Sequence, residues 1–63
     1  MAEARDRLQT LRHDLSNPLA AILAETQLLL LNEKQLDAET VESLKRMEAL
    51  ARKMRQILQH VDA

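Results

Sequence analysis

Hydrophobic residues in the first half of the chain recur at intervals of three and four, with polar and charged residues between them. The set with this spacing is Leu8, Leu11, Leu15, Leu19, Ile22, Thr26 and Leu29. At about 100° of rotation per residue, these positions fall within about 80° of arc, as in the apolar seam of an amphipathic helix. The pattern predicts a first helix over about residues 2–31.

A second helical pattern follows a polar stretch over 32–36, which predicts a turn. Its apolar stripe consists of Leu44, Met47, Leu50, Ala51, Met54, Ile57, Leu58 and Val61. Asp37 stands where an N-cap residue would begin this helix, which we expect to run over about 37–61. Asn32 is expected to end the first helix in a left-handed backbone conformation, where glycine usually stands.

The pairing of two such helices leaves half of each apolar stripe uncovered. The chain has 63 residues and no cysteine, and its two histidines lie too far apart for a local metal motif, so oligomerisation is the remaining stabiliser. We predict an all-α fold in which residues 1–63 form a single domain, an antiparallel helical hairpin that forms a homodimeric four-helix bundle. The alternative is a longer coiled coil belonging to a larger protein, which would show the same seams.

Composition excludes several classes of function. Glycine and aromatic residues are absent, so the chain has no phosphate-binding loop and no platform on which bases could stack. The formal net charge of −1 argues against binding to nucleic acid. No apolar run in the chain is long enough to cross a bilayer, and no signal peptide is visible. We expect no direct membrane contact and a cytoplasmic location, whether or not a parent protein is anchored in a membrane.

His13 stands apart from the core pattern, because it points about 170° away from the centre of the first helix's seam. It is therefore not a core histidine, and is either a surface residue without a task or a reactive one. Asp14 follows directly and can accept a hydrogen bond from the ring, while Asn17 lies one turn further along the same outward face. Pro18 should bend or loosen the helix just beyond the histidine. His60, on the polar face of the last turn, is assigned no chemistry.

An exposed neutral imidazole is a nucleophile, and the residues around it lack the partners that several other reactions require. There is no serine or cysteine partner for acyl transfer, no ligand cluster for metal-assisted hydrolysis and no element that could hold a nucleotide. What remains is a group that His13 accepts and passes on. Phosphoryl is the candidate, because an imidazole nitrogen can attack in line from an open helix face.

The segment from His13 to Leu19, His-Asp-Leu-Ser-Asn-Pro-Leu, resembles the H-box of sensor histidine kinases. The family pattern is His, Glu or Asp, Leu, any residue, Thr or Asn, Pro, Leu. The likeness continues through Ile22, Leu28, Leu29, Arg46, Met47 and Leu50. It covers about residues 5–63 and corresponds to the dimerisation and histidine-phosphotransfer (HisKA-type) domain of that family, with the seven-residue box as its specific part.

This resemblance implies a role for each matching residue. His13 would be phosphorylated from ATP and Mg²⁺ held by a separate catalytic domain, so the chain itself would bind no cofactor and no metal. Asp14 would act as general base, although glutamate is commoner there and reaches one methylene further. Asn17 would help to position water for dephosphorylating the partner regulator, and Pro18 would bend the helix.

Ala20 and Ala24 share the outward face of His13, where small side chains let another backbone approach. Alanines are also good helix formers, so these two residues alone do not indicate a docking site. The resemblance implies that a response regulator docks near them and presents its receiver aspartate to the phosphohistidine. Ala24 replaces a frequent glycine of the family, which should stiffen the helix below the site.

The sequence therefore predicts the phosphoacceptor and dimerisation module of a two-component sensor histidine kinase, inactive without an ATP-binding domain in cis or in trans. Two alternatives stay open, namely a structural dimerisation hairpin in which His13 has no chemistry and a standalone histidine phosphotransfer protein.

Overall fold

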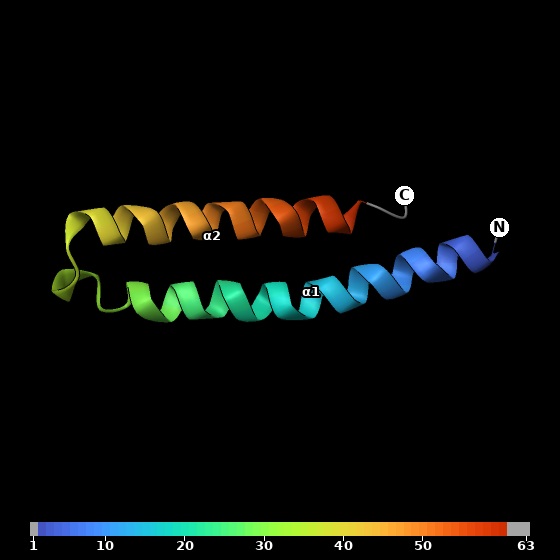
Figure 1. Cartoon of the computed structure of the whole chain (residues 1–63), viewed down its shortest axis with the longest axis horizontal. Coiled ribbons are helices and arrows are strands. Elements are labelled where there is room, and N and C mark those ends of the chain that lie inside the picture. The colour runs from blue at the N-terminus through green and yellow to red at the C-terminus, as the bar shows by residue number, and fades with distance from the viewer. Residues whose placement is uncertain (1, 61–63) are drawn as a thin grey trace.

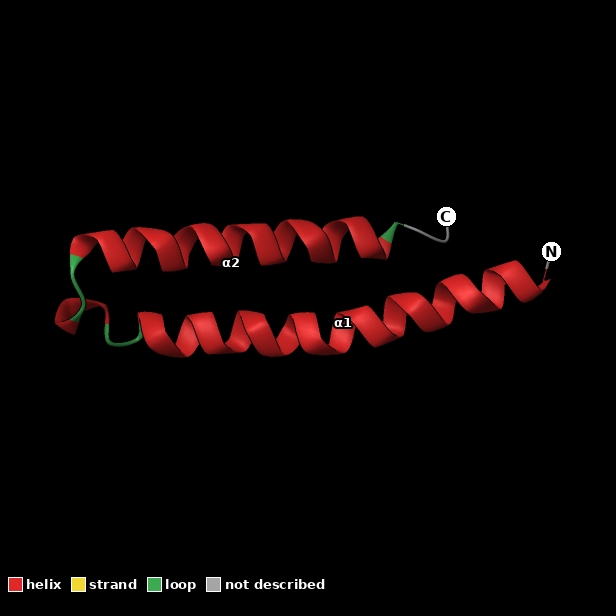
Figure 2. Cartoon of the chain, viewed as in Figure 1, coloured by secondary structure: helices red, strands yellow, loops and turns green. Residues whose placement is uncertain are grey.

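The computed structural model describes residues 2–60, which form two antiparallel helices lying side by side (Figures 1 and 2). Helix α1 spans Ala2–Leu30, the short 3-10 helix η1 spans Glu33–Gln35, and helix α2 spans Ala38–Gln59. The molecule is elongated, with extents of 51 × 14 × 11 Å. The hairpin expected from the sequence is confirmed for these residues, while Val61, assigned to the second apolar stripe, lies outside the described residues.

Helix α2 begins at an N-cap that matches the sequence prediction. The Asp37 carboxylate accepts a hydrogen bond of 2.7 Å from the backbone N–H of Thr40, which satisfies one of the free donors of the first turn. Hydrogen bonding to Thr40 stabilises the ionised carboxylate and holds the pKa of Asp37 below its ordinary value of 3.8. A local sequence rule is therefore sufficient to place this helix start.

The end of α1 differs from the expectation. Asn32 has φ −102° and ψ 28°, and no described residue has a positive φ, so the prediction of a left-handed stop was wrong. Instead the backbone tightens into bonds between residues three apart, Leu31 N–H to Leu28 C=O at 3.2 Å and Asn32 N–H to Leu29 C=O at 3.1 Å. Because such bonds satisfy the last carbonyls of the helix, no left-handed residue is needed.

The buried residues lie between the two helices, in the half of the hairpin nearer the turn. They are Leu19, Leu23 and Thr26 from α1, and Val41, Leu44 and Ala51 from α2. The hydroxyl of Thr26 donates a hydrogen bond of 2.7 Å to the carbonyl of Leu23, so the single buried polar side chain of the described residues is satisfied. This core is small, and none of its side chains is completely buried.

Most of the predicted apolar seam lies outside this core. The exposed large hydrophobic residues include Leu8, Leu11, Leu15, Ile22 and Leu29 on α1, and Met47, Leu50, Met54 and Ile57 on α2. At about 100° of rotation per residue, the exposed apolar residues of α1 are centred roughly 65° around the helix axis from its buried side. Those of α2 are centred roughly 100° from the buried side of α2. Each helix therefore has two apolar faces, one that meets the other helix and one that the single chain leaves uncovered.

The two uncovered faces point to the same side of the hairpin. Viewed from the N-terminus of α1, the uncovered face of α1 lies counterclockwise from its buried side. Because α2 runs the opposite way, its uncovered face lies clockwise from its buried side in the same view. We call this combined surface the open apolar face. In a four-helix bundle, each helix contacts two neighbouring helices, and the two directions of contact are approximately at right angles around its axis. The predicted dimer requires this arrangement.

Pro18 lies inside α1, which continues through it without interruption. Figure 1 shows the helix changing direction in its cyan part, between the blue N-terminal portion and the green portion that packs against α2. Proline explains this bend, because it cannot donate to the carbonyl four residues earlier and its ring crowds that carbonyl. No helix within residues 2–60 has the length and hydropathy needed to cross a membrane.

Candidate functional site

His13 projects from the middle of α1, on the N-terminal side of the bend. Its side chain is 76% exposed, so the ring is open to water. Its direction is about 110° from the side of α1 that meets α2 and nearly opposite the open apolar face. A second hairpin packed on that face would therefore leave His13 on the outside of the bundle.

The carboxylate of Asp14 lies beside the His13 ring. The Nδ1 atom of His13 lies 3.8 Å from the Asp14 Oδ1 atom, and the carboxylate side chain is itself 70% exposed. This separation exceeds a hydrogen bond, but it places the negative charge on the Nδ1 side of the ring. The carboxylate therefore favours the tautomer with its proton on Nδ1, which leaves the lone pair on Nε2, the nitrogen on the other side of the ring.

Polar residues N-terminal to His13 form shallow hollows beside it, which the sequence analysis did not single out. One hollow is lined by Asp6, Gln9, Thr10 and His13, and a neighbouring one by Asp6, Arg7, Thr10, Leu11 and Asp14. Positions three, four and seven residues before His13 share its side of the helix, so helical spacing could have identified these neighbours. The histidine thus sits at the border between a polar surface and the smaller residues that follow it.

The remaining predicted site residues follow His13 along the helix. Asn17, Ala20 and Ala24 are all exposed and lie within about 40° of His13 around the helix axis. From His13 to Ala24 the rise along α1 is about 16 Å. Pro18 is exposed too, but it points toward the edge of the open apolar face. The structure thus places Asn17 and the two alanines on the same side of α1 as His13. Pro18 points elsewhere and affects only the backbone of this segment.

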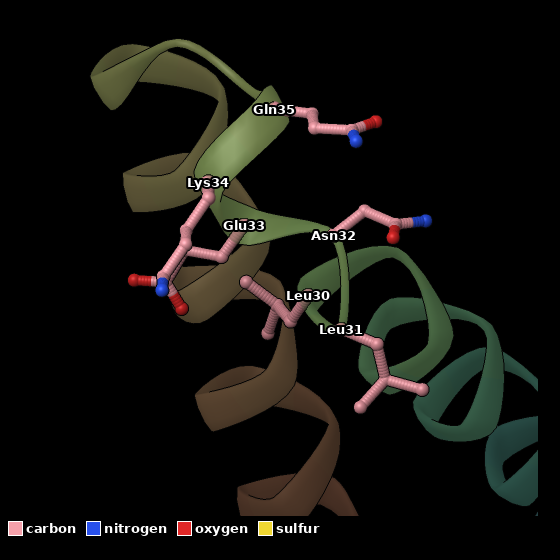
Figure 3. Close-up of a pocket in the computed structure, with 6 residues that line it drawn as sticks. All are labelled: Leu30, Leu31, Asn32, Glu33, Lys34 and Gln35. Carbon is pink, nitrogen blue, oxygen red and sulfur yellow. The ribbon is translucent and has the colours of Figure 1, made fainter.

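Other surface features lie away from this site. A hollow at the turn is lined by Leu30, Leu31, Asn32, Glu33, Lys34 and Gln35. Figure 3 shows Asn32 and Gln35 extending to one side, with Glu33 and Lys34 on the other. The Glu33 carboxylate forms an ion pair of 3.5 Å with Lys45, which ties η1 to α2. No cluster of three or more metal-ligating side chains exists among residues 2–60.

His60 provides an internal comparison for His13. It is the C-cap residue of α2, and its backbone N–H donates to the carbonyls of Ile57 and Leu58. Its side chain is exposed like that of His13, but no ion pair with a carboxylate is formed by it within the described residues. Among residues 2–60, the ion pairs therefore give a carboxylate partner to His13 and none to His60.

Comparison with known proteins agrees with this geometry. Residues 3–62 match the family model of the His Kinase A (phospho-acceptor) domain, nearly the whole chain. No curated protein and no solved structure matches. Domains of this family generally dimerise and work within two-component systems. The predicted fold class, a helical hairpin that forms a homodimeric four-helix bundle, agrees with this match and with the open apolar face.

Proposed function

Because the chain belongs to the family of His Kinase A (phospho-acceptor) domains, we propose that His13 is its phosphoacceptor. It receives a phosphoryl group from ATP and passes it to an aspartate on the receiver domain of a response regulator. The observation that supports this assignment is the open imidazole with a carboxylate on its Nδ1 side, 3.8 Å away. Such a module works where ATP and the regulator are present, in the cytoplasm.

The loading step uses the lone pair of His13 Nε2. ATP and Mg²⁺ are held by a separate nucleotide-binding domain, because a helical hairpin without glycine has no loop that wraps phosphates. Nε2 attacks the γ-phosphorus, an N–P bond forms, and the bond from phosphorus to the bridging oxygen breaks as ADP leaves. The ring gains positive charge as it attacks, and Asp14 stabilises that charge and accepts the Nδ1 proton.

The unloading step reverses the direction of transfer. A receiver carboxylate oxygen attacks the phosphorus, the N–P bond breaks, and its electron pair returns to Nε2 while Nδ1 regains a proton. The receiver approaches over Ala20 and Ala24, where the short side chains keep the α1 backbone within reach. Asn17, one turn from His13, is suited to hydrogen-bond a water that hydrolyses the phosphorylated regulator.

Phosphorylation of the intact chain tests the proposal. The chain is mixed with a nucleotide-binding domain of proven histidine kinase activity and radiolabelled ATP, and acid-labile, base-stable label is measured. We expect labelling of the native chain, none of His13→Gln, and native labelling of the matched control His60→Gln. Both substitutions lie on the surface, so each should change stability by less than about 0.5 kcal/mol.

The competing function is a structural dimerisation hairpin in which His13 is inert. An active donor domain that labels neither the native chain nor His60→Gln would establish that alternative. Label that persists in His13→Gln would place the acceptor elsewhere and overturn the assignment. Transfer is tested separately, by adding receiver domains to the labelled chain and following the loss of label from it.

A further inference from the structure

The His13 ring borders the turn of α1 that precedes it. Side chains of an α-helix point back toward its N-terminus, so a residue covers the surface about one turn before its own Cα. The structure agrees, because the hollow that His13 borders is lined by Asp6, Gln9 and Thr10, which all come before it in the sequence. The Asp14 carboxylate, on the Nδ1 side of the ring, lines a neighbouring hollow instead. The hollow with Gln9 is therefore the one that remains for a group carried on Nε2.

Gln9 and Thr10 flank the ring on that preceding turn. They stand four and three residues before His13, about 40° to one side of it and about 60° to the other around the helix axis. Both side chains are exposed, and neither forms a hydrogen bond within residues 2–60. The hydroxyl of Thr26, by contrast, is bound to the carbonyl of Leu23. The Gln9 amide and the Thr10 hydroxyl are thus donors available to a group on the ring.

The charged residues of this segment lie further along α1 or point in other directions. Asp6, seven residues before His13, shares its side of the helix but lies about 10 Å away along the axis, where water and salt screen its charge. The cations Arg5, Arg7 and Arg12 point about 80° to 120° away around the helix. The donors that flank the ring are therefore uncharged, and such donors bind a phosphoryl group more weakly than arginine does.

We propose that Gln9 and Thr10 form a holding site for the phosphoryl group of the phosphohistidine. The Gln9 carboxamide and the Thr10 hydroxyl each donate a hydrogen bond to one of its oxygens, and this inference rests on the proposed role of His13. The holding site keeps the group over the preceding turn between loading and unloading. It leaves the phosphorus open on the side opposite the ring nitrogen, from which the receiver carboxylate attacks in line. Because both donors are uncharged, they slow the loss of the group to water without preventing its transfer.

Chemical phosphorylation tests the holding site without a kinase domain. Phosphoramidate, a small phosphoryl donor, reacts with histidine: an N–P bond forms on the ring as the P–N bond of the reagent breaks, and ammonia leaves. All chains carry His60→Gln, so His13 is the single histidine that can be loaded. The reagent is then removed, and phosphorus NMR follows the decay of the Nε2 phosphohistidine. In this decay water attacks the phosphorus, the N–P bond breaks and its electron pair returns to Nε2.

Removing either donor should shorten the lifetime of the phosphohistidine, because hydrogen bonds to a charged group stabilise the bound state. Gln9→Met and Thr10→Val keep side chains of similar size and should each shorten it about threefold, and the double variant about tenfold. Thr10→Ser keeps the hydroxyl and should retain the native lifetime. Gln27→Met is the matched control, since this exposed glutamine lies about 21 Å from His13 along α1. Phosphorylation should also shift the side-chain amide NMR signal of Gln9 and leave that of Gln27 in place.

Unchanged lifetimes in Gln9→Met and Thr10→Val, at equal helix content by circular dichroism, would overturn the holding site. A shorter lifetime in Arg12→Gln alone would overturn it as well, since an arginine would then hold the group. Labelling by a kinase domain is measured on the same variants. Native labelling with unchanged lifetimes would refute the holding site and leave His13 as phosphoacceptor. Shortened lifetimes in a chain that no active kinase domain labels would support the two donors and overturn the proposed function.

Discussion

The two parts of α1 on either side of Pro18 share one continuous helix but are stabilised differently. The part after the proline contributes three buried residues, Leu19, Leu23 and Thr26, to the core with α2. The part before it, residues 2–17, has no buried residue at all, and it contains His13 and Asp14. Within a single chain, the turn-proximal half therefore holds the fold, while the other half presents the proposed phosphoacceptor.

This difference matters because a helix without packing is marginal in water. Leu8, Leu11 and Leu15 of the N-terminal part are exposed in the single chain and belong to the open apolar face, which the predicted dimer would cover. The site half thus depends on dimerisation and on the continuity of α1 through Pro18. Its stability can change without disturbing the turn-proximal core, which suits the proposed role of His13 as a residue that meets two different partners in succession.

The largest expected effect comes from placing a charge in the open apolar face. Ile22→Asp buries a carboxylate at the centre of the dimer interface, and we expect loss of the dimer together with most of the helical signal. Light scattering monitored by refractive index and far-ultraviolet circular dichroism measure both. Ala20→Asp, two residues away on the His13 surface, is the matched control and should stay dimeric. An Ile22→Asp chain that remains a helical dimer would show that this face is not the interface.

A smaller effect is expected from thinning the turn-proximal core. Leu23→Ala removes a buried side chain and should lower the free energy of unfolding by about 2–4 kcal/mol. Leu28→Ala, at a nearby exposed position, should cost less than about 1 kcal/mol. Urea denaturation followed by circular dichroism measures the two variants at equal concentrations. Equal losses would mean that the two sides of α1 contribute alike, contrary to the burial pattern.

Replacing Pro18, which bends α1, should raise the free energy of unfolding rather than lower it. Pro18→Ala restores a backbone donor in the middle of α1, and we expect unfolding to become less favourable by about 1–3 kcal/mol. Asn17→Ala, the exposed neighbour, should change stability by less than about 0.5 kcal/mol. Hydrogen exchange of the amides before residue 18 should slow in Pro18→Ala, because the two halves then open together. Unchanged exchange there would indicate that the proline does not separate the halves.

The helices and their start signals could be predicted from the sequence because they follow local rules. The N-cap at Asp37 needs only a short polar side chain before a helical pattern, and the structure has it. The division of the apolar residues into two faces could not be predicted in the same way. Leu23 falls outside the regular seam yet is buried, because α2 approaches α1 from that side, and periodicity alone does not say where a neighbour stands.

The site shows the same limit. The outward direction of His13 follows from its helical position relative to the leucines, and the structure agrees. Helical spacing is enough to place Asp6, Gln9 and Thr10 near His13, but the shape of the hollow that they line depends on side-chain rotamers, which spacing does not fix. The prediction of a left-handed Asn32 was wrong because a 3-10 turn satisfies the same carbonyls at the end of α1. A left-handed residue and a 3-10 turn are two ways to end a helix, and the sequence does not distinguish them here.

The smallest expected effect is a loss of stability at low pH, which should arise at the N-cap of α2 in the turn-proximal half. The pKa of Asp37 is lowered in the folded chain by its hydrogen bonds from Thr40, so the unfolded chain binds this proton more readily. The cap therefore contributes fully to folding stability above pH 3.8, the pKa of Asp37 in the unfolded chain. This contribution is lost as the pH falls through the lower pKa of the folded chain. Asp37→Asn keeps a capping oxygen that does not titrate, so its stability should change less over this range. Urea denaturation at pH 5 and below pH 3.8 measures the difference between native and variant. A native chain that loses no more stability than Asp37→Asn would mean that this carboxylate does not hold the start of α2, and that packing against α1 alone fixes it.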